Sequence, residues 1–223
     1  MPAEPQWKVK TDAESRRPVF VAALVIIAGQ AWVARSLRLD PFWLFPLIST
    51  VLLVASIAVY EGRDEPGLVA RILSHALSTV LVIANAVSLV LLVRGVFLGS
   101  SLKPTGLLFA GLALWLVNVA VFALIYWELD GGGPEARADG YGDRCPDFVF
   151  PQQQADQQGL ASATWKPSFY DYLYVSLTSS VAFSPTDAMP YSKRAKLAMG
   201  AENVLSFATL AVLVARAVNS AHG

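Results

Sequence analysis

Five hydroxyl side chains and one carboxylate gather in a short stretch near the carboxyl end of the chain, between Thr178 and Asp187. Oxygen atoms of this kind, together with backbone carbonyls, can replace the water around a small cation. A carboxylate at the mouth of such a turn would attract cations and repel anions. The sequence therefore predicts a cation-binding turn formed by Thr178, Ser179, Ser180, Val181, Ala182, Phe183, Ser184, Thr186 and Asp187.

Two apolar segments must position this turn. The segment before it, Phe169–Ala182, is too short to cross a bilayer core of about 30 Å and too apolar for a surface loop, which favours a re-entrant helix. The segment after it, Leu197–Val218, is long enough to span. Polar groups inside a span are costly in hydrocarbon and are functional candidates. On the last helix these candidates are Glu202, Ser206 and Thr209.

Four further apolar runs lie upstream, at Pro18–Ala34, Phe42–Tyr60, Leu68–Leu98 and Thr105–Trp127. Each has roughly the length that a membrane-spanning helix needs. The sequence thus predicts an all-α membrane protein with five transmembrane helices plus one re-entrant, pore-like helix before the last span. The expected regions are a polar tail (1–17), four membrane helices (18–128), a polar water-exposed loop (129–167), and the re-entrant helix, turn and last helix (168–219).

The composition excludes several classes of protein. Hydrophobic residues make up 55% and charged residues only 15%, against roughly 25% charged in soluble domains. The 17 basic and 17 acidic residues balance, so the sequence lacks the excess of basic residues that is typical of nucleic-acid-binding proteins. The single cysteine, Cys145, cannot form an internal disulfide or a metal cluster. Motifs of metalloproteases, hydrolases and phosphate loops are absent from the sequence, so neither an enzyme nor a cofactor is expected.

The segment from the re-entrant helix onward resembles the pore-loop unit of two-transmembrane potassium-channel-like cation channels. The family pattern F-x-D-x-L-Y-x-S followed by D-x-x-P is matched by Phe169, Asp171, Leu173, Tyr174, Ser176, Asp187 and Pro190. The resemblance places Phe169, Asp171, Tyr174 and Ser176 on the pore helix. The two filter glycines are missing. A gapless alignment puts residues 184–186 over Gly-Tyr-Gly, and a shift by two puts residues 179–184 over Thr-Thr-Val-Gly-Tyr-Gly.

The resemblance implies a homotetramer, because one pore loop per chain cannot close a pore. It also implies passage of monovalent cations, with poor potassium selectivity because both glycines are lost. The alternative is a non-conducting multi-span membrane protein that keeps the re-entrant hairpin as a structural or subunit-interaction element. The whole chain also resembles a family of uncharacterised bacterial integral membrane proteins, which implies a multi-pass protein of the bacterial inner membrane, with the lipid bilayer as its partner.

The basic residues and the channel resemblance predict opposite orientations. With the amino terminus inside, cytoplasmic segments hold 12 basic residues and the other side holds 5. This bias favours a cytoplasmic amino terminus and a cytoplasmic 129–167 loop. In pore-loop channels the filter opens to the outside instead.

Other polar residues have plainer interpretations. Gly140–Asp143 reads Gly-Tyr-Gly-Asp, but no pore helix precedes it, so a turn is expected. Asp139, Asp143 and Asp147 lack calcium-loop spacing and are expected in a solvated loop.

Glu202 could pair with Lys196 or Arg194, or could line a pore. A polar stripe on the third span, which includes Asn85, favours helix packing. Gln30 and Asn118 are expected to form hydrogen bonds between helices.

Overall fold

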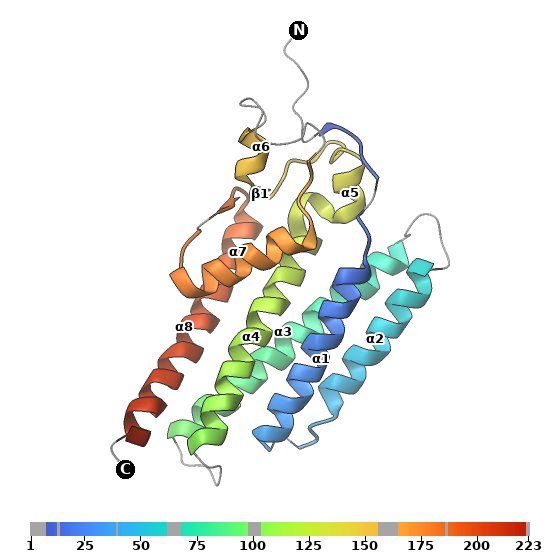
Figure 1. Cartoon of the computed structure of the whole chain (residues 1–223). Helices are drawn as coiled ribbons and strands as arrows, with labels where there is room; N and C mark the ends of the chain where they lie inside the picture. Colours follow the sequence, from blue (N-terminus) through green and yellow to red (C-terminus); the bar gives the residue numbers. More distant parts are fainter. Residues whose placement is uncertain are drawn as a thin grey trace. The chain divides into compact units, whose positions relative to one another are not determined.

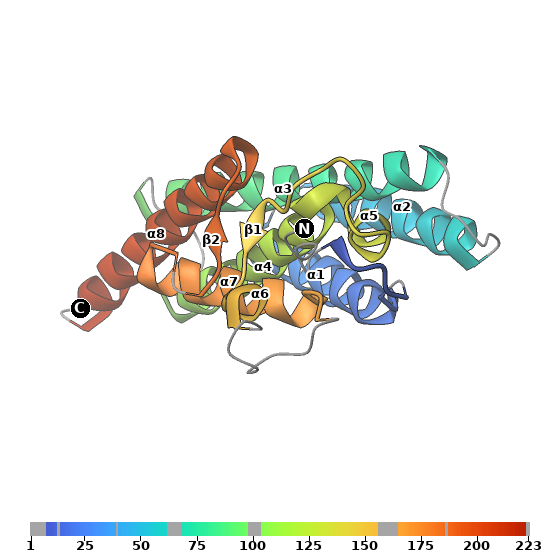
Figure 2. The same cartoon turned by 90° about the horizontal axis from the view of Figure 1, so that it is seen from above.

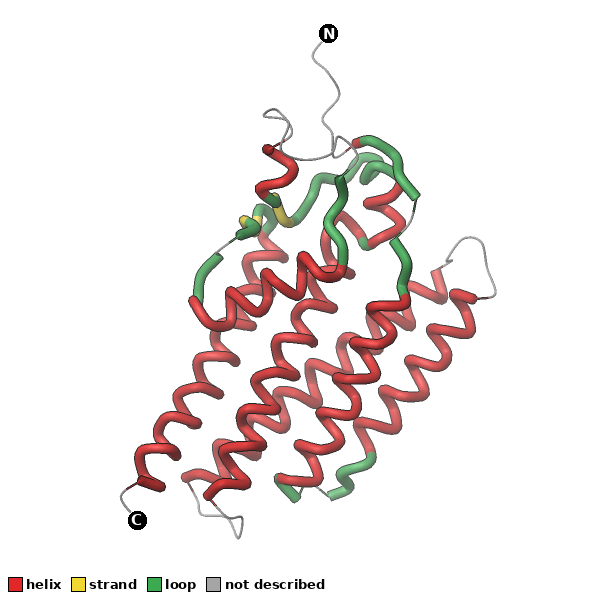
Figure 3. Tube along the Cα trace, viewed as in Figure 1, coloured by secondary structure: helices red, strands yellow, loops and turns green. Residues whose placement is uncertain are grey.

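The structure is a computed structural model that describes residues 8–12, 14–38, 40–61, 68–97, 104–155, 165–185 and 187–221 (Figure 3). The chain divides into two compact units. The first consists of Met1–Pro18 with Phe122–Asn203, and the second of Val19–Val121 with Val204–Gly223. Helices α4 and α8 each contribute several turns to both units, and α1 contributes its first two residues to the first unit.

Every apolar run of the sequence forms a helix. The long helices are α1 (Arg17–Ser36), α2 (Leu44–Glu61), α3 (Leu68–Phe97), α4 (Pro104–Leu129) and α8 (Lys193–Ala221). Within the described residues, four candidate spans are long and apolar enough to cross a membrane: Arg17–Ser36, Leu68–Val96, Thr105–Gly132 and Lys193–Val218. The apolar part of α2, Leu44–Tyr60, is shorter. At 1.5 Å per residue it extends about 26 Å, slightly less than a bilayer core.

The second unit is held together by apolar packing with a few buried hydrogen bonds. Its core cluster consists of Val33, Leu89, Leu92, Leu107, Leu114 and Val212. Gln30 Nε2 donates to the Leu81 carbonyl at 2.8 Å. Asn85 Nδ2 donates to Asn118 Oδ1 at 2.7 Å, and Asn118 Nδ2 donates to Ser206 Oγ at 3.0 Å. The predicted role of Gln30 and Asn118 as hydrogen-bonding residues between helices is confirmed.

The first unit combines the end of α4 and the start of α8 with shorter elements. These are η2 (Asp130–Gly132), α5 (Pro134–Ala138), β1 (Phe148–Val149), α6 (Pro151–Ala155), α7 (Phe169–Ala182) and β2 (Met189–Pro190). The two-residue strands β1 and β2 pair antiparallel, with Phe148 opposite Pro190 (Figure 2). Helix α7 has the predicted bounds of the re-entrant segment, and it lies across the first turns of α8 (Figure 1).

The prediction of a water-exposed loop at 129–167 is wrong for much of its described part. Tyr141, Phe148 and Phe150 are at most 2% exposed. The Phe150 ring meets the Tyr172 ring edge-on at 5.4 Å between centroids, and Phe148 meets it at 6.2 Å. These aromatic side chains have no periodic spacing in the sequence. They are buried because the segment folds back against α7, and they form the core of the first unit.

Candidate functional site

The start of α7 is fixed by a capping box. Ser168 is the N-cap, and its backbone N–H and hydroxyl both donate to Asp171 Oδ2 at 2.7 Å. In return the Ser168 side chain accepts a hydrogen bond from the backbone at the third helical position. Such boxes satisfy amides that have no partner within the helix. Asp171, which the channel resemblance places on a pore helix, thus determines where α7 begins.

Helix α7 has one packed face and one exposed face. The packed face holds Phe169, Tyr172, Val175, Ser176, Ser179 and Ser180. The exposed face holds Tyr170, Tyr174, Leu177 and Val181, which are 40–66% exposed. These four residues follow helical spacing and form one apolar stripe. Of the residues predicted for the pore helix, Phe169 and Ser176 are therefore packed inside the unit and Tyr174 faces outward.

The predicted cation-binding turn begins later than expected. Thr178–Ala182 form the last turns of α7. The Thr178 hydroxyl donates to the Tyr174 carbonyl, Ser179 donates to Asn203 Oδ1 and Ser180 to the Leu177 carbonyl, each at 2.8 Å. The prediction that Thr178, Ser179, Ser180, Val181 and Ala182 belong to an open turn is corrected, because the helical hydrogen-bond ladder continues through them.

The non-helical turn starts at Phe183. This residue takes a left-handed conformation, with φ of 54°, and its N–H donates to the Ser179 carbonyl at 2.7 Å. Ser184 is exposed and Asp187 is half-buried. Thr186 lies outside the described residues. Within the described part of the turn, Phe183, Ser184 and Pro185 are exposed on the surface of the single chain.

Glu202 lies on the first part of α8 and is fully buried. The Tyr126 hydroxyl donates to Glu202 Oε2, and the Ser176 hydroxyl donates to Glu202 Oε1. Arg194 binds Asp147 instead, and among the described residues no ion pair joins Glu202 to a basic side chain. The prediction that Glu202 pairs with Lys196 or Arg194 is wrong. The carboxyl group connects α4, α7 and α8 through two hydroxyl groups.

The other two polar candidates on α8 belong to the second unit and are also buried. Ser206 accepts the hydrogen bond from Asn118 described above. The Thr209 hydroxyl donates to the Leu205 carbonyl of its own helix at 2.8 Å. Within this unit, the Ser206 hydroxyl bonds to a neighbouring helix, whereas the Thr209 hydroxyl bonds to a backbone carbonyl of α8 itself.

A buried polar cluster, which the sequence did not indicate, lies at the end of α4. Asp130 is fully buried. Its Oδ1 accepts the backbone N–H groups of Asp147 at 2.6 Å and Phe148 at 3.1 Å. Its Oδ2 accepts the Tyr172 hydroxyl at 2.5 Å. Arg137 Nη1 donates to the Asp130 carbonyl at 3.1 Å. Asp130 thus anchors the returning chain and α7 to the end of α4.

Asp147 continues this cluster to the start of α8. It accepts Arg194 Nε at 2.7 Å, Arg194 Nη2 at 2.5 Å and the Gly131 N–H at 2.8 Å. Burial acts to raise the pKa of Asp147, but these hydrogen bonds outweigh it and hold the pKa below its usual value. The expectation of a solvated Asp147 is therefore wrong, whereas Asp139 and Asp143 are exposed as predicted.

The Gly140–Asp143 segment forms a turn, as predicted. Gly140, Tyr141 and Gly142 have φ of 73°, 65° and 55°, the left-handed region that glycine favours. Tyr141 is buried, and burial, with the nearby Asp130 charge, raises the pKa of its hydroxyl. The tetrapeptide therefore closes a turn around a core tyrosine.

The amino-terminal segment also contributes to this unit. Glu14 Oε2 accepts Trp127 Nε1 at 2.6 Å, and Glu14 Oε1 accepts the Phe169 N–H at 2.8 Å. Arg16 pairs with Glu135 and lies 5.0 Å from the centre of the Trp127 ring. These contacts join the predicted polar tail to α4 and α7.

No protein family, curated protein or solved structure matches the chain.

Proposed function

We propose that the chain is one subunit of a homotetrameric, poorly selective cation channel, a multi-pass protein of the bacterial inner membrane. In this proposal α2 is a fifth span, tolerated by local thinning of the bilayer. Helix α7 enters the membrane without crossing it. The turn from Phe183 to Asp187 surrounds the ion path. Four copies are required because one chain supplies one turn.

The observation that carries the proposal is the form of the segment 169–218. A helix of 14 residues ends in a left-handed residue, an exposed non-helical turn follows, and a long apolar helix begins at Lys193. Exposed backbone at membrane depth is tolerated only where it lines a water-filled cavity or is covered by protein. Four such turns around an axis would meet that condition and would place rings of carbonyl and hydroxyl oxygens around a cation.

The exposed face of α7 supports assembly into an oligomer. Tyr170, Tyr174, Leu177 and Val181 form a stripe that nothing covers within the described part of the chain. A neighbouring subunit or lipid would cover it in the membrane. Four half-buried Asp187 carboxylates near the turn would favour cations over anions.

The alternative is a non-conducting protein in which α7 is a structural hairpin. A specific observation favours it: the hydroxyls of Thr178, Ser179 and Ser180 are all bonded within the subunit. If the remaining turn is too short to line a pore, α7 serves only packing or contact between subunits.

Current across a planar bilayer containing purified protein tests the proposal. Wild type should conduct small cations, and Asp187→Asn should lower the conductance and the preference for cations over anions. Asp143→Asn removes an equal charge from an exposed turn and should leave both unchanged. The mass of the protein in nanodiscs should equal four chains. A monomer or dimer without current, or currents indifferent to Asp187→Asn, would favour the structural hairpin.

A further inference from the structure

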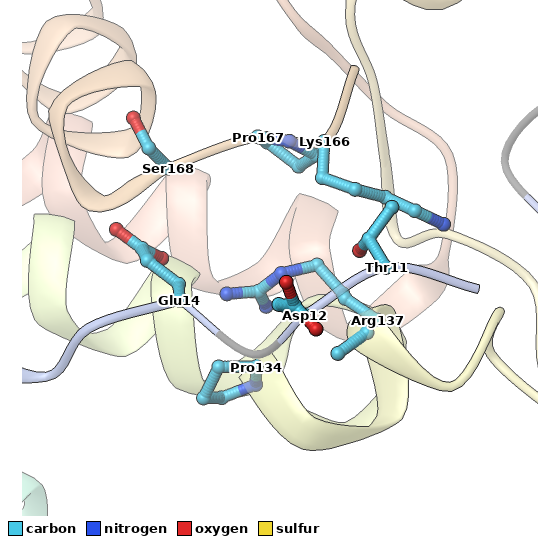
Figure 4. A pocket seen from close by; sticks show the side chains of 9 residues that line it. Thr11, Asp12, Glu14, Pro134, Arg137, Lys166, Pro167 and Ser168 are labelled. Carbon is cyan, nitrogen blue, oxygen red and sulfur yellow. The ribbon is translucent and has the colours of Figure 1, made fainter. Parts of the chain in front are cut away.

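A small pocket lies in the first unit where the amino-terminal segment, α5 and the start of α7 meet (Figure 4). Its volume is about 80 Å³. Pockets for drug-sized ligands measure roughly 300–1,000 Å³, and a water molecule takes about 30 Å³ of liquid volume. The pocket therefore fits a single small polar group. The side chains that decide its chemistry are those of Thr11, Asp12, Glu14, Arg137 and Lys166.

Arg137 forms part of the pocket wall, and its guanidinium is rigidly held. Nη1 donates to the carbonyls of Trp127 at 2.6 Å and Asp130 at 3.1 Å. The group also lies 5.1 Å from the centre of the Tyr172 ring. Arg137 is 2% exposed, yet its Nη2 has no hydrogen-bond partner among the described residues. A buried donor of this kind, particularly on a charged group, is expected to have a partner.

A second cation lines the same pocket. Lys166 is half-buried and lies 5.1 Å from the centre of the Tyr141 ring. Burial, and then the positive charge of Arg137, lower the pKa of its amino group. Two cations that repel each other beside one cavity favour an anion between them. The flexible four-carbon stem of lysine allows the ammonium group to turn toward such an anion.

Two carboxylates also line the pocket and must be weighed against these cations. Both oxygens of Glu14 already accept hydrogen bonds, from Trp127 and from the Phe169 N–H. These donors are neutral, so Glu14 keeps its negative charge, but both of its oxygens already have donors other than the pocket cations. Asp12 is exposed, so water and salt screen its charge. Among the pocket side chains, the buried donor that still lacks an acceptor within the described residues is Arg137 Nη2.

The pocket residues adjoin the ends of two candidate spans. Glu14 precedes the span that begins at Arg17, and Pro134 follows the span that ends at Gly132. In the proposed membrane protein, the ends of these spans would lie at the level of lipid headgroups. We propose that the pocket binds one phosphate group, either the headgroup phosphate of an anionic lipid or a soluble phosphate, through Arg137 Nη2 and the Lys166 ammonium. This site is independent of ion conduction.

The test measures binding by the full-length protein in phosphatidylcholine nanodiscs. Inorganic phosphate is titrated by calorimetry, and short-chain phosphatidylglycerol is followed by native mass spectrometry. Saturable binding of phosphate identifies a soluble anion, and binding of phosphatidylglycerol alone identifies a lipid headgroup. Lys166→Gln should weaken the binding roughly tenfold, as expected for loss of a hydrogen bond to a charged group. Lys193→Gln removes an equal charge from an exposed position and should have no effect.

Arg137→Gln should abolish the binding, but it also removes bonds to the end of α4, so Lys166→Gln is the deciding variant. Asp12→Asn should leave binding unchanged or strengthen it, because the carboxylate only repels the ligand. Failure of both ligands to bind, or equal binding by Lys166→Gln and Lys193→Gln, would overturn the proposal. Weaker binding by Asp12→Asn would also contradict it, since it would indicate that the pocket recognises a cationic group.

Discussion

Substitution of Asp147 by Asn tests whether the buried cluster stabilises the first unit. The carboxylate accepts two hydrogen bonds from Arg194 and one from the buried Gly131 N–H. Asparagine keeps one acceptor oxygen and presents an NH₂ group to the remaining donors. The variant therefore loses the ionic attraction to Arg194 and leaves at least one donor without an acceptor.

The loss in free energy of unfolding for Asp147→Asn can be estimated from the exposure of each hydrogen-bond partner. The Arg194 side chain is 54% exposed, so water can replace its bonds, and the ion pair contributes only about 1 kcal/mol. A buried donor left unsatisfied costs about 1–3 kcal/mol. The sum is about 3 kcal/mol. For a chain of this length that corresponds to a fall in the midpoint of thermal unfolding of about 6–12 °C.

The assay is thermal unfolding of purified protein in one detergent, with Asp143→Asn as the exposed control. The folded-state pKa of Asp147 lies below its ordinary value of 3.8. Its ionised form therefore stabilises the fold fully above about pH 3.8, and this contribution is lost as the pH falls through the folded pKa. The difference between wild type and Asp147→Asn should be constant near neutral pH and should shrink in strong acid. A variant as stable as the Asp143→Asn control would refute the reasoning.

Two further substitutions test other parts of the fold. Gly131→Ala should lower the stability more than Gly142→Ala. Both glycines have positive φ, but a Cβ at Gly131 would lie 2.2 Å from the Tyr141 ring, whereas a Cβ at Gly142 meets nothing within 4 Å. Equal midpoints of thermal unfolding for the two variants would contradict this prediction. Asn118→Leu removes two buried hydrogen bonds, one to α3 and one to α8. The variant should lower the free energy of unfolding in micelles by about 1 kcal/mol. An unchanged free energy would show that relaxed packing replaces the two hydrogen bonds.

The long helices and α7 could be predicted from the sequence because their signal is local, whereas the short η2, α5 and α6 lie in the segment predicted to be a loop. Apolar runs of about 20 residues indicate spans wherever they occur, and the 14-residue length of Phe169–Ala182 set α7 apart. The candidate turn was placed too early, because Ser179 and Ser180 suggest a turn by composition. In the structure, their hydroxyls find acceptors on α8 and on α7 itself, so the helix continues through them.

The sequence by itself determined the long apolar helices and the shorter α7, because hydropathy and length are properties of consecutive residues. Of the five predicted spans, four are long and apolar enough to cross a membrane in the part of the chain that the structure describes. Only the tertiary structure decided what the buried polar groups do. Tyr172 meets Asp130 across 42 positions of sequence, Arg194 meets Asp147 across 47, and Tyr126 meets Glu202 across 76. No periodicity relates such pairs. From the sequence alone, a carboxylate near the end of a span is expected to be solvated. In the folded chain, residues distant in sequence donate hydrogen bonds to it.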